Sequence, residues 1–560
     1  MILMKKICFT LLLLNVFCII NAQVIDVEKL PKAKSFGWSG AVGANTNFYN
    51  TTSAEKRSNP LSWNLHGNVN FNVYETFDLP FSFTVGKYQN IFTKPYLQFG
   101  ITPTYKWAKL HLGHRNITFN PYTLGGHTFL GAGVELNPKK WRFAAMYGRL
   151  RRAVEIDTTF QSAQIPSFKR IGFGAKIGYG TASNFIDLMY FSGKDQAASI
   201  TSWKNPNIID KIGDANTMLP GENKVIGISG KATIHKNLTV NADAGLSFIN
   251  ADITDKLKGS KAKVDFKRKL LIAGKGGLGY AFKNMNLRLD YERIAPDYLS
   301  FGSYFFDTDI ENITLSPSGI LAGGKLVYAI SAGRQRNDLD KNKTEATHRF
   351  IANANISVNP TTKWGVDMNY NNFAIRQFSG TELLNDSVRI RQVNQTITLT
   401  PHFTIAKDTS ASHTFSVTGN YNDVNDRNVV TRAYGNMQAM MLSVNHSSSF
   451  SRWGNSINTG LNYNIINMAA TDNKQVGATL GYTQNFFNDA LNMNVSANYN
   501  KSYINNVADG KVINSSASLG YTFAKRHALS FAFNIIRTTS LQFENYTETL
   551  GSLAYVVRIK

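Results

Sequence analysis

The sequence is poor in cysteine, in proline and in long apolar runs. Its 560 residues include only two cysteines and 14 prolines. Both cysteines, Cys8 and Cys18, lie in the first apolar stretch, so the remainder of the chain can form no disulfide bond and depends on hydrogen bonding and burial. After residue 22 there is no apolar run of about 20 residues, which excludes a membrane-spanning helix from that part of the sequence.

Acidic residues are also scarce. The chain has 60 Lys and Arg against 37 Asp and Glu, a formal net charge of +23. Such an excess predicts anionic partners. No nucleic-acid recognition motif accompanies the charge, so we expect no nucleic-acid partner and favour phosphorylated lipid headgroups or acidic solutes.

The first 22 residues have the features of a secretory signal peptide. Lys5 and Lys6 precede an apolar stretch over residues 7–20, and Ala22 supplies a small residue at the expected cleavage point. Removing Lys5 and Lys6 lowers the net charge from +23 to +21. Residues 23–35 are then a short polar lead-in in the periplasm, and residues 36–560 are expected to form one domain.

What the sequence has in abundance is a two-residue rhythm. In residues 61–74, Leu, Trp, Val and Phe alternate with Ser, His and Asn. Successive side chains of a strand point to opposite faces, so one face is apolar and the other is rich in amides. The pattern recurs some two dozen times, for example in residues 286–292, 364–371, 393–403 and 491–500, which is typical of a transmembrane β-barrel.

Short polar turns alternate with longer polar segments along the chain. The longer ones include residues 152–165, 193–221, 252–265, 377–388 and 424–436. We therefore predict an all-β fold, a single large transmembrane antiparallel barrel of about 26 strands (roughly 22–28) with short periplasmic turns and longer extracellular loops. Five tryptophans beside short turns or the first strand are expected at one membrane interface: Trp38, Trp107, Trp141, Trp364 and Trp453.

Three places complicate the strand assignment. Residues 294–336 are split into strands 298–315 and 320–336 around the turn signal Ser316-Pro317-Ser318-Gly319. Pro103 and Pro401 fall inside predicted strands, where proline removes a ladder donor. A bulge or a shifted strand boundary is expected at each of these two prolines.

The chain resembles Gram-negative outer-membrane β-barrel proteins. The resemblance rests on the alternating strands, on the signal ending Asn21-Ala22-Gln23 and on the final strand, where Leu553, Tyr555, Val557 and Ile559 alternate with Ser552, Ala554 and Arg558. It implies localisation in the outer membrane. The chain departs from the pattern at its end, because such barrels usually finish with an aromatic residue and this one finishes with Ile559-Lys560.

A barrel of this size raises the question of what fills it. TonB-dependent receptors and usher-like pores resemble it in size but carry a plug domain, and neither residues 23–35 nor residues 193–221 are long enough for one. At about 22 strands natural barrels already need a plug. We therefore expect occlusion by inward-folded loops or by a protein partner.

Two functions remain open at this stage. The first is a large gated or partner-occluded conduit, preferring anions, for the passage of a bulky solute or macromolecule. The second is a structural or anchoring subunit of a surface complex, with the lumen plugged by partner proteins and no transport of its own.

Candidate binding residues follow from charge and from the polar faces. One basic cluster is interpreted as a contact for lipopolysaccharide phosphates, with a solvated loop as the alternative. It comprises Lys256, Lys258, Lys261, Lys263, Lys267, Arg268 and Lys269, together with Arg149, Arg151 and Arg152. The lumen is expected to be lined by Asn64, His66, Asn68, Asn70, Arg288, Asp290, Glu292, Asp367, Asn369, Asn394, Thr396, Asn494 and Asn498.

Catalysis finds little support in the sequence. His111, His114 and His127 lie close together in the chain, but a metal or catalytic site needs converging geometry and supporting partners. We therefore expect no enzyme activity, no catalytic residue, no metal site and no cofactor.

Overall fold

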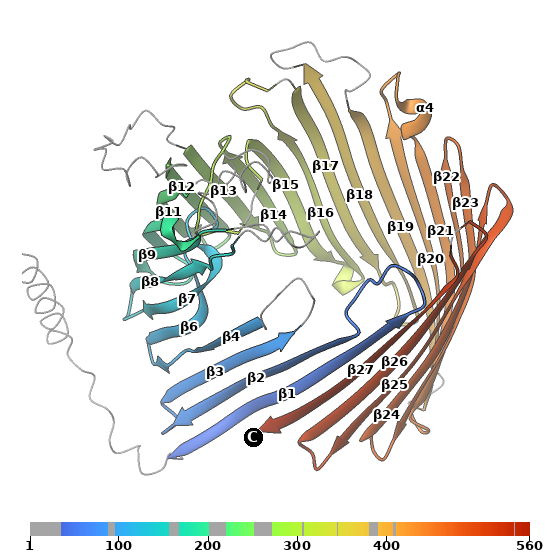
Figure 1. Cartoon of the computed structure of the whole chain (residues 1–560). Coiled ribbons are helices and arrows are strands. Elements are labelled where there is room, and N and C mark those ends of the chain that lie inside the picture. The colour runs from blue at the N-terminus through green and yellow to red at the C-terminus, as the bar shows by residue number, and fades with distance from the viewer. Residues whose placement is uncertain are drawn as a thin grey trace, which may run out of the picture.

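The chain forms one closed antiparallel β-barrel. The computed structural model describes residues 35–87, 96–155, 167–200, 220–250, 271–304, 307–343, 345–379, 390–406, 410–542 and 544–559. Each strand pairs with its neighbours in sequence, and β1 (Phe36–Thr51) pairs with β27 (Tyr546–Ile559) to close the barrel (Figure 1). The predicted signal peptide, residues 1–22, lies outside the described residues.

The other strands follow in chain order around the wall. They are β2 (Leu61–Val73), β3 (Phe77–Lys87), β4 (Tyr96–Ile101), β5 (Thr104–Tyr105), β6 (Ala108–Thr118), β7 (Gly125–Leu136), β8 (Trp141–Arg151), β9 (Lys169–Gly180), β10 (Phe185–Gln196), β11 (Glu222–His235), β12 (Leu238–Asn250), β13 (Leu271–Ala281), β14 (Met285–Ile294), β15 (Ile310–Leu321), β16 (Leu326–Arg336), β17 (Glu345–Val358), β18 (Trp364–Ser379), β19 (Arg391–Ala406), β20 (Ala411–Asp426), β21 (Met437–Phe450), β22 (Asn455–Met468), β23 (Asp472–Phe486), β24 (Leu491–Ile504), β25 (Val507–Phe523) and β26 (His527–Ser540).

The 27 strands occupy 26 positions in the wall, because β4 and β5 share one place between β3 and β6. The break between them falls at Thr102 and Pro103, and the register to both neighbours is the same on either side. The prediction of about 26 strands is therefore confirmed. At Pro401 the expected bulge is wrong: the ladder from β19 to β20 omits Thr400 and Pro401 but resumes without a shift.

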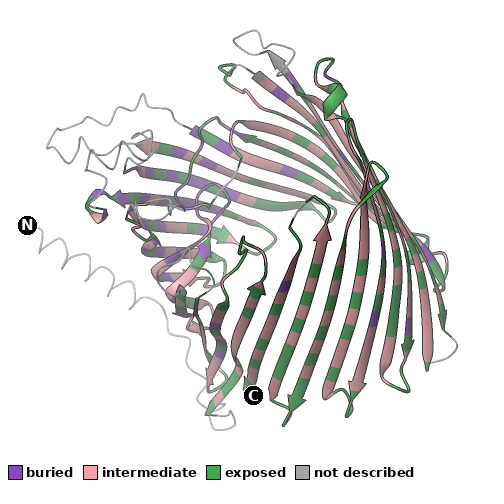
Figure 2. Ribbon diagram, turned by 45° about the vertical axis from the view of Figure 1, so that its right-hand side comes forward, coloured by how far each residue is buried: buried purple, intermediate pink, exposed green. Residues whose placement is uncertain are grey.

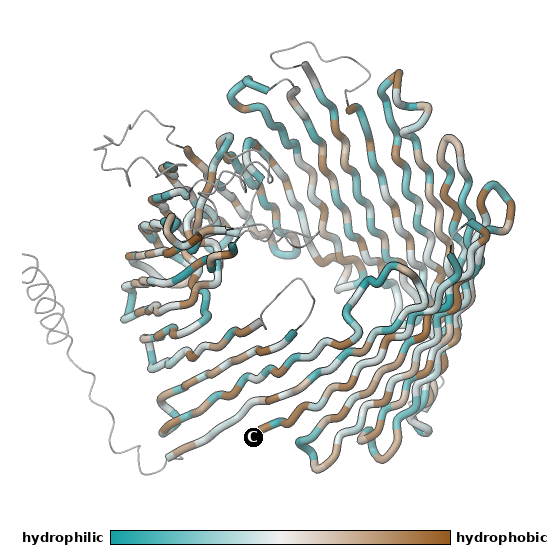
Figure 3. Tube along the Cα trace, viewed as in Figure 1, coloured by the Kyte–Doolittle hydropathy of each residue, from teal (hydrophilic) through white to brown (hydrophobic). Residues whose placement is uncertain are grey.

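The two faces of the wall differ as the alternation predicted. Along each strand apolar and polar residues succeed one another (Figure 3). Outward side chains such as Leu61, Leu65 and Trp364 are about half exposed in the isolated chain, as expected for groups that face lipid. A closed barrel leaves no unpaired sheet edge, which is what a hydrocarbon environment requires. The predicted fold class and outer-membrane localisation are thus confirmed.

The connections separate into two rims. Short turns join β7 to β8 and β17 to β18, and the predicted tryptophans Trp141 and Trp364 begin the strands that follow them. The opposite rim, called here the long-loop rim, carries segments such as residues 295–309 and 427–436. Helical segments are confined to η2 (Ala197–Ser199), η5 (Ala322–Gly324) and α4 (Arg432–Gly435) in the described parts of the chain. None of the described helices is long and apolar enough to cross a membrane.

One predicted strand is wrong. Residues 298–304 and 307–309 are not part of the wall, since β15 begins only at Ile310. The turn that follows β15 lies at Ala322–Gly324 and not at residues 316–319. Pro317 instead lies within β15, where the ladder to β16 omits Ser316 and Pro317 without changing register. Residues 295–304 fold back against the inner face of the barrel.

The apolar core is confined to one side of the barrel. Every buried apolar residue among those described lies between Val69 and Phe301. Most belong to two clusters that join the inner faces of β6 to β14 to residues 119–124 and 295–304. Buried positions accordingly gather on one side of the wall, while the strands from β15 onward show mainly intermediate and exposed residues (Figure 2).

Candidate functional site

Two loops from the long-loop rim fold into the barrel and pack together. We call residues 119–124 and 295–304 the inner layer. A parallel β-bridge joins Leu124 to Gly302, and the Gly125 N–H donates to the Gly302 carbonyl at 2.9 Å. The Ser300 hydroxyl also donates to the Thr123 carbonyl. The two loops, although far apart in sequence, therefore form one unit.

Two buried asparagines fasten the inner layer to the wall. Asn223 on β11 accepts a hydrogen bond from the Phe301 N–H at 2.9 Å and donates to the Leu299 carbonyl at 3.2 Å. Asn120, within the layer, donates to the Ala244 carbonyl of β12 at 3.1 Å. An amide side chain can both donate and accept a hydrogen bond. Each asparagine therefore makes hydrogen bonds between loop and wall that a paired strand would otherwise make through its backbone.

Glycines in the wall make room for the layer. A Cβ atom at Gly245 of β12 would collide with the Tyr298 hydroxyl, and one at Gly227 of β11 would collide with the Thr123 side chain. Strand glycines commonly mark sites where another backbone approaches closely. These two positions therefore accommodate the layer and do not merely relieve crowding between strands.

An ionic cluster holds the layer near the long-loop rim. The Arg170 guanidinium contacts both oxygens of buried Asp195, at 2.8 and 2.9 Å, and its charged carbon lies 3.3 Å from the centre of the Phe301 ring. Arg151 approaches the same carboxylate at 3.5 Å. A bidentate arginine–carboxylate pair is geometrically specific, so this cluster fixes the position of Phe301.

A second polar contact ties the layer to β14. The Tyr122 hydroxyl donates to Glu292 at 2.6 Å, and the Tyr298 hydroxyl donates to the Tyr122 carbonyl at 2.7 Å. Burial, and secondly the bond to Glu292, raise the pKa of the Tyr122 phenol well above its ordinary value. Tyr122 therefore stays protonated and remains a donor to the carboxylate.

The remaining inner wall is lined by neutral amides and hydroxyls. Asn353 and Asn355 on β17 lie opposite Asn371 and Asn369 on β18, and the four amides bond to one another in sequence. Further round the wall, Asn498 donates to Thr479 at 2.6 Å. Charged residues on this face are few and of both signs, among them Arg349, Asp367, Asp426, Glu548 and Arg558.

The register places the predicted lumen residues on the inner face. Those on β2 are Asn64, His66, Asn68 and Asn70; those on β14 are Arg288, Asp290 and Glu292; the others, on β18, β19 and β24, are Asp367, Asn369, Asn394, Thr396, Asn494 and Asn498. Glu292 contacts the inner layer, where it accepts the hydrogen bond of the Tyr122 hydroxyl. Arg288 and Asp290 pair with each other at 2.6 Å.

Only part of the predicted basic cluster lies within the described residues. Lys256, Lys258, Lys261, Lys263, Lys267, Arg268 and Lys269 lie outside the described residues. Arg149 pairs with Leu130 and Ile171, so it shares their outward face. A register shift after Arg149 turns Arg151 inward to Asp195, while the exposed Arg152 contributes a carbonyl to the Ser167 hydroxyl. Arg149, Arg151 and Arg152 nevertheless all line one hollow of about 530 Å³ near the long-loop rim.

The three histidines do not converge. His111 faces inward, where its Nε2 lies 2.7 Å from Glu135. His114 faces Phe99 on the other side of the wall, and His127 stacks on Tyr304 near the long-loop rim. No group of three potential metal ligands occurs among the described residues.

Inward-folded loops were expected from the sequence, but neither the two loops of the inner layer nor their two asparagine anchors could be identified from it. A signal was nevertheless present in β10, where Ile186, Leu188 and Tyr190 face outward while Met189 and Phe191 are buried on the inner side. A strand that is apolar on both faces must be covered on both.

Comparison with known proteins adds only an architectural similarity. No protein-family model matches the sequence, and no curated protein matches it. The chain is similar to the PapC translocation pore of the P pilus usher, with 10% identity over 93% of this chain and 99% of that chain and a TM-score of 0.35. It is also similar to an E. coli P pilus tip assembly intermediate of PapC, PapD, PapK and PapG (10% identity, 92% and 60% coverage, TM-score 0.45) and to Pseudomonas aeruginosa OpdQ (10%, 93% and 99%, 0.30).

Proposed function

We propose that this protein is an outer-membrane channel for bulky, neutral, hydrophilic molecules. The observation that carries the proposal is the asymmetry of its interior. The inner layer covers the wall from β6 to β14. The wall from β17 to β27 presents amides and hydroxyls, and none of the apolar residues described on these strands is buried. When a hydroxylated solute replaces water at an amide or hydroxyl group, one hydrogen bond replaces another and the net change in free energy is small.

The charge distribution argues against the anion preference expected from the sequence. Along the inner wall basic groups are matched by acids, as in the pairs Arg170–Asp195 and Arg142–Asp187. The uncovered wall carries charges of both signs. The proposed pore therefore selects by size and hydrogen bonding more than by charge, and the inner layer sets its width.

A planar-bilayer recording of the detergent-purified protein tests this function. We expect single-channel conductance with nearly equal permeability to small cations and anions, and entry of neutral oligosaccharides into liposomes that carry the protein. Strong anion selectivity would contradict the lumen proposed here. A silent barrel that copurifies with a stoichiometric companion would instead support the alternative, a structural subunit plugged by partner proteins.

Two further expectations belong to the proposal. We propose that the protein is not an enzyme: of its inward histidines, His111 is paired with Glu135 at 2.7 Å and His66 with Asn64 at 3.0 Å, and neither contact includes a nucleophile. We also propose lipopolysaccharide as a lipid partner. Arg149 remains a candidate contact, whereas Arg151 is engaged by Asp195 inside the barrel.

A further inference from the structure

The ladder between β7 and β8 stops before either strand ends. Its last pair toward the long-loop rim is Leu130 with Arg149, although both strands continue beyond it. Past this pair, the Thr128 N–H donates to the Tyr304 hydroxyl of the inner layer at 3.1 Å. A loop side chain therefore takes the place of a strand partner, and β7 and β8 separate at this end of the wall.

The separation leaves a hollow of about 530 Å³, called here the β7–β8 hollow, which is lined from both faces of the wall. Leu130 and Arg149 face outward, as does Leu97, whose side chain is half exposed. Phe301 and Leu150 are buried on the inner side. The volume falls within the range of about 300–1,000 Å³ that is usual for small-molecule sites. The hollow therefore reaches from the lipid-facing surface to the inner layer.

The β7–β8 hollow is strongly cationic. Four arginines line it, Arg149, Arg151, Arg152 and Arg170, and its described lining includes no acidic residue. Arg170 and Arg151 already hold the Asp195 carboxylate. Within the described parts of the chain, the Arg149 and Arg152 guanidinium groups pair with no acid. Because a guanidinium group can donate two parallel hydrogen bonds to a carboxylate, these two arginines can bind a second, external carboxylate.

The outer surface next to the hollow is apolar without interruption. Toward the opposite rim, the outward pairs that follow are Ala132–Tyr147, Val134–Ala145 and Leu136–Phe143. Trp141 and Arg149 stand 8 positions apart on β8. At about 3.3 Å per residue and a tilt of about 40°, this is about 20 Å along the membrane normal, against an apolar band of about 25 Å. Arg149 therefore lies at the edge of the band, where headgroups begin.

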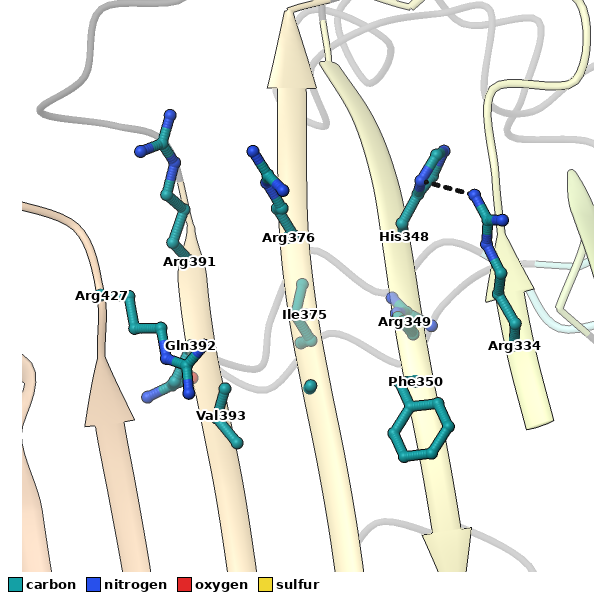
Figure 4. Close-up of a pocket in the computed structure, with 11 residues that line it drawn as sticks. Arg334, His348, Arg349, Phe350, Ile375, Arg376, Arg391, Gln392, Val393 and Arg427 are labelled. Atoms are coloured by element: carbon teal, nitrogen blue, oxygen red, sulfur yellow. Dashed lines mark hydrogen bonds between the residues drawn. The ribbon is translucent and has the colours of Figure 1, made fainter. Parts of the chain in front are cut away.

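A second cationic hollow at the same rim lacks this apolar surface. It has a volume of about 460 Å³, and Arg391 and Arg427 are among the residues that line it (Figure 4). Nearer the membrane centre, the outward face of that part of the wall carries Gln395 opposite Asn372 and Asp423. An acyl chain would meet polar groups there, whereas the β7–β8 hollow joins its cations to a continuous apolar surface.

We propose that the β7–β8 hollow binds a long-chain carboxylate, the anion of a fatty acid. Its head contacts Arg149 and Arg152, and its chain lies on the outward surface of β6 and β7, which includes Leu112 and Leu130. The head is a carboxylate because the adjoining arginines already bind one. The inference rests on the outer-membrane location and does not depend on conduction.

The test measures binding of hexadecanoate to the full chain in a nonionic detergent by native mass spectrometry. The variant combines Arg149→Gln with Arg152→Gln, and we expect at least tenfold weaker binding because two charge-assisted contacts are lost. The matched control combines Arg391→Gln with Arg427→Gln, the same charge change in the hollow of Figure 4, and should bind as the native chain does. The gel shift between unheated and boiled samples shows that each variant is folded.

A second comparison uses the native chain alone. Hexadecanol and hexadecyltrimethylammonium should bind at least tenfold more weakly than hexadecanoate, and hexadecanoate with a diazirine on its chain should label peptides of β6 and β7. Equal binding of hexadecanol would overturn the proposal, as would native affinity in the variant that lacks Arg149 and Arg152 or labelling confined to other strands.

Binding of diphosphorylated lipid A without binding of hexadecanoate would also overturn the proposal, because the hollow would then be a lipopolysaccharide site. Conductance should be unchanged in the variant that lacks Arg149 and Arg152. This readout separates failure of the carboxylate site from failure of the proposed channel.

Discussion

Replacing Asn223 with alanine is expected to release the inner layer and raise the conductance of the barrel severalfold. The Asn223 side chain is fully buried and bonds to the Phe301 N–H, to the Leu299 carbonyl and to the Ser247 hydroxyl, the last at 2.8 Å. Its removal leaves buried polar groups without partners, each at a cost of about 1–3 kcal/mol. We therefore expect docking of the layer to weaken by about 3 kcal/mol in total.

The matched control is Asn353→Ala, which removes an amide of the same size from the uncovered wall. Asn353 is only partly buried and faces the lumen, so water can replace the bonds that it makes with Asn355 and Asn371. Single-channel recording should show larger and noisier openings for Asn223→Ala than for Asn353→Ala. Identical traces for the two variants would mean that the inner layer does not limit the pore.

Replacing Asp187 with alanine is expected to cause the largest loss of stability in the barrel wall. The Asp187 carboxylate is buried, with an exposed fraction of 2%, and lies 2.9 Å from Arg142 and 3.9 Å from Lys176. Without it Arg142 loses its carboxylate partner, and Lys176 keeps only its weaker interaction with Glu135. Breaking a buried ion pair in this way costs about 3–5 kcal/mol.

Asp290→Ala provides the comparison, since its partner Arg288 is half exposed and the pair is partly solvated. Surface pairs contribute about 0–1 kcal/mol. The midpoint of urea unfolding, followed by the gel shift between unheated and boiled samples, should fall much further for Asp187→Ala. Equal midpoints would show that water in the lumen solvates the Arg142 and Lys176 charges as well as the carboxylate does.

Much of the wall could be predicted from local sequence alone. The alternation in residues 61–74 determines which side chains face lipid, because a one-residue slip would expose every amide to the membrane. The same argument places Asn494 and Asn498 inside β24. Strand number followed from counting turns, and the one serious error, at residues 298–309, came from treating an apolar loop as a strand.

The inner layer could not be predicted in the same way. Its hydrogen bonds join Tyr122 to Tyr298 and Asn223 to Phe301, residues 176 and 78 positions apart. Local periodicity carries no information on such contacts. Apolar residues on the inner faces of β8 and β10, such as Met146 and Met189, indicate that something covers them but not which loop does.

The alignment of basic side chains from separate strands was invisible for a different reason. Arg336, Arg376 and Arg391 belong to three separate strands, and their alignment depends on the lengths of the intervening loops and on the shear of the whole sheet. A pattern in the sequence can group only basic residues that are close in the chain. Proximity in sequence grouped Arg149 with Arg151, which the structure places on opposite faces.

The position of the inner layer also bears on the order in which the molecule can fold. The strands that carry it, β6 to β14, form one uninterrupted stretch of chain that ends where residues 295–304 begin. Closure of the barrel instead joins residues as far apart as Tyr49 and Glu548, 499 positions away. Contacts over a shorter stretch of chain cost less loop entropy. The layer can therefore dock on a sheet that is still open, and the ladder between β1 and β27 would be the last part of the molecule to become native.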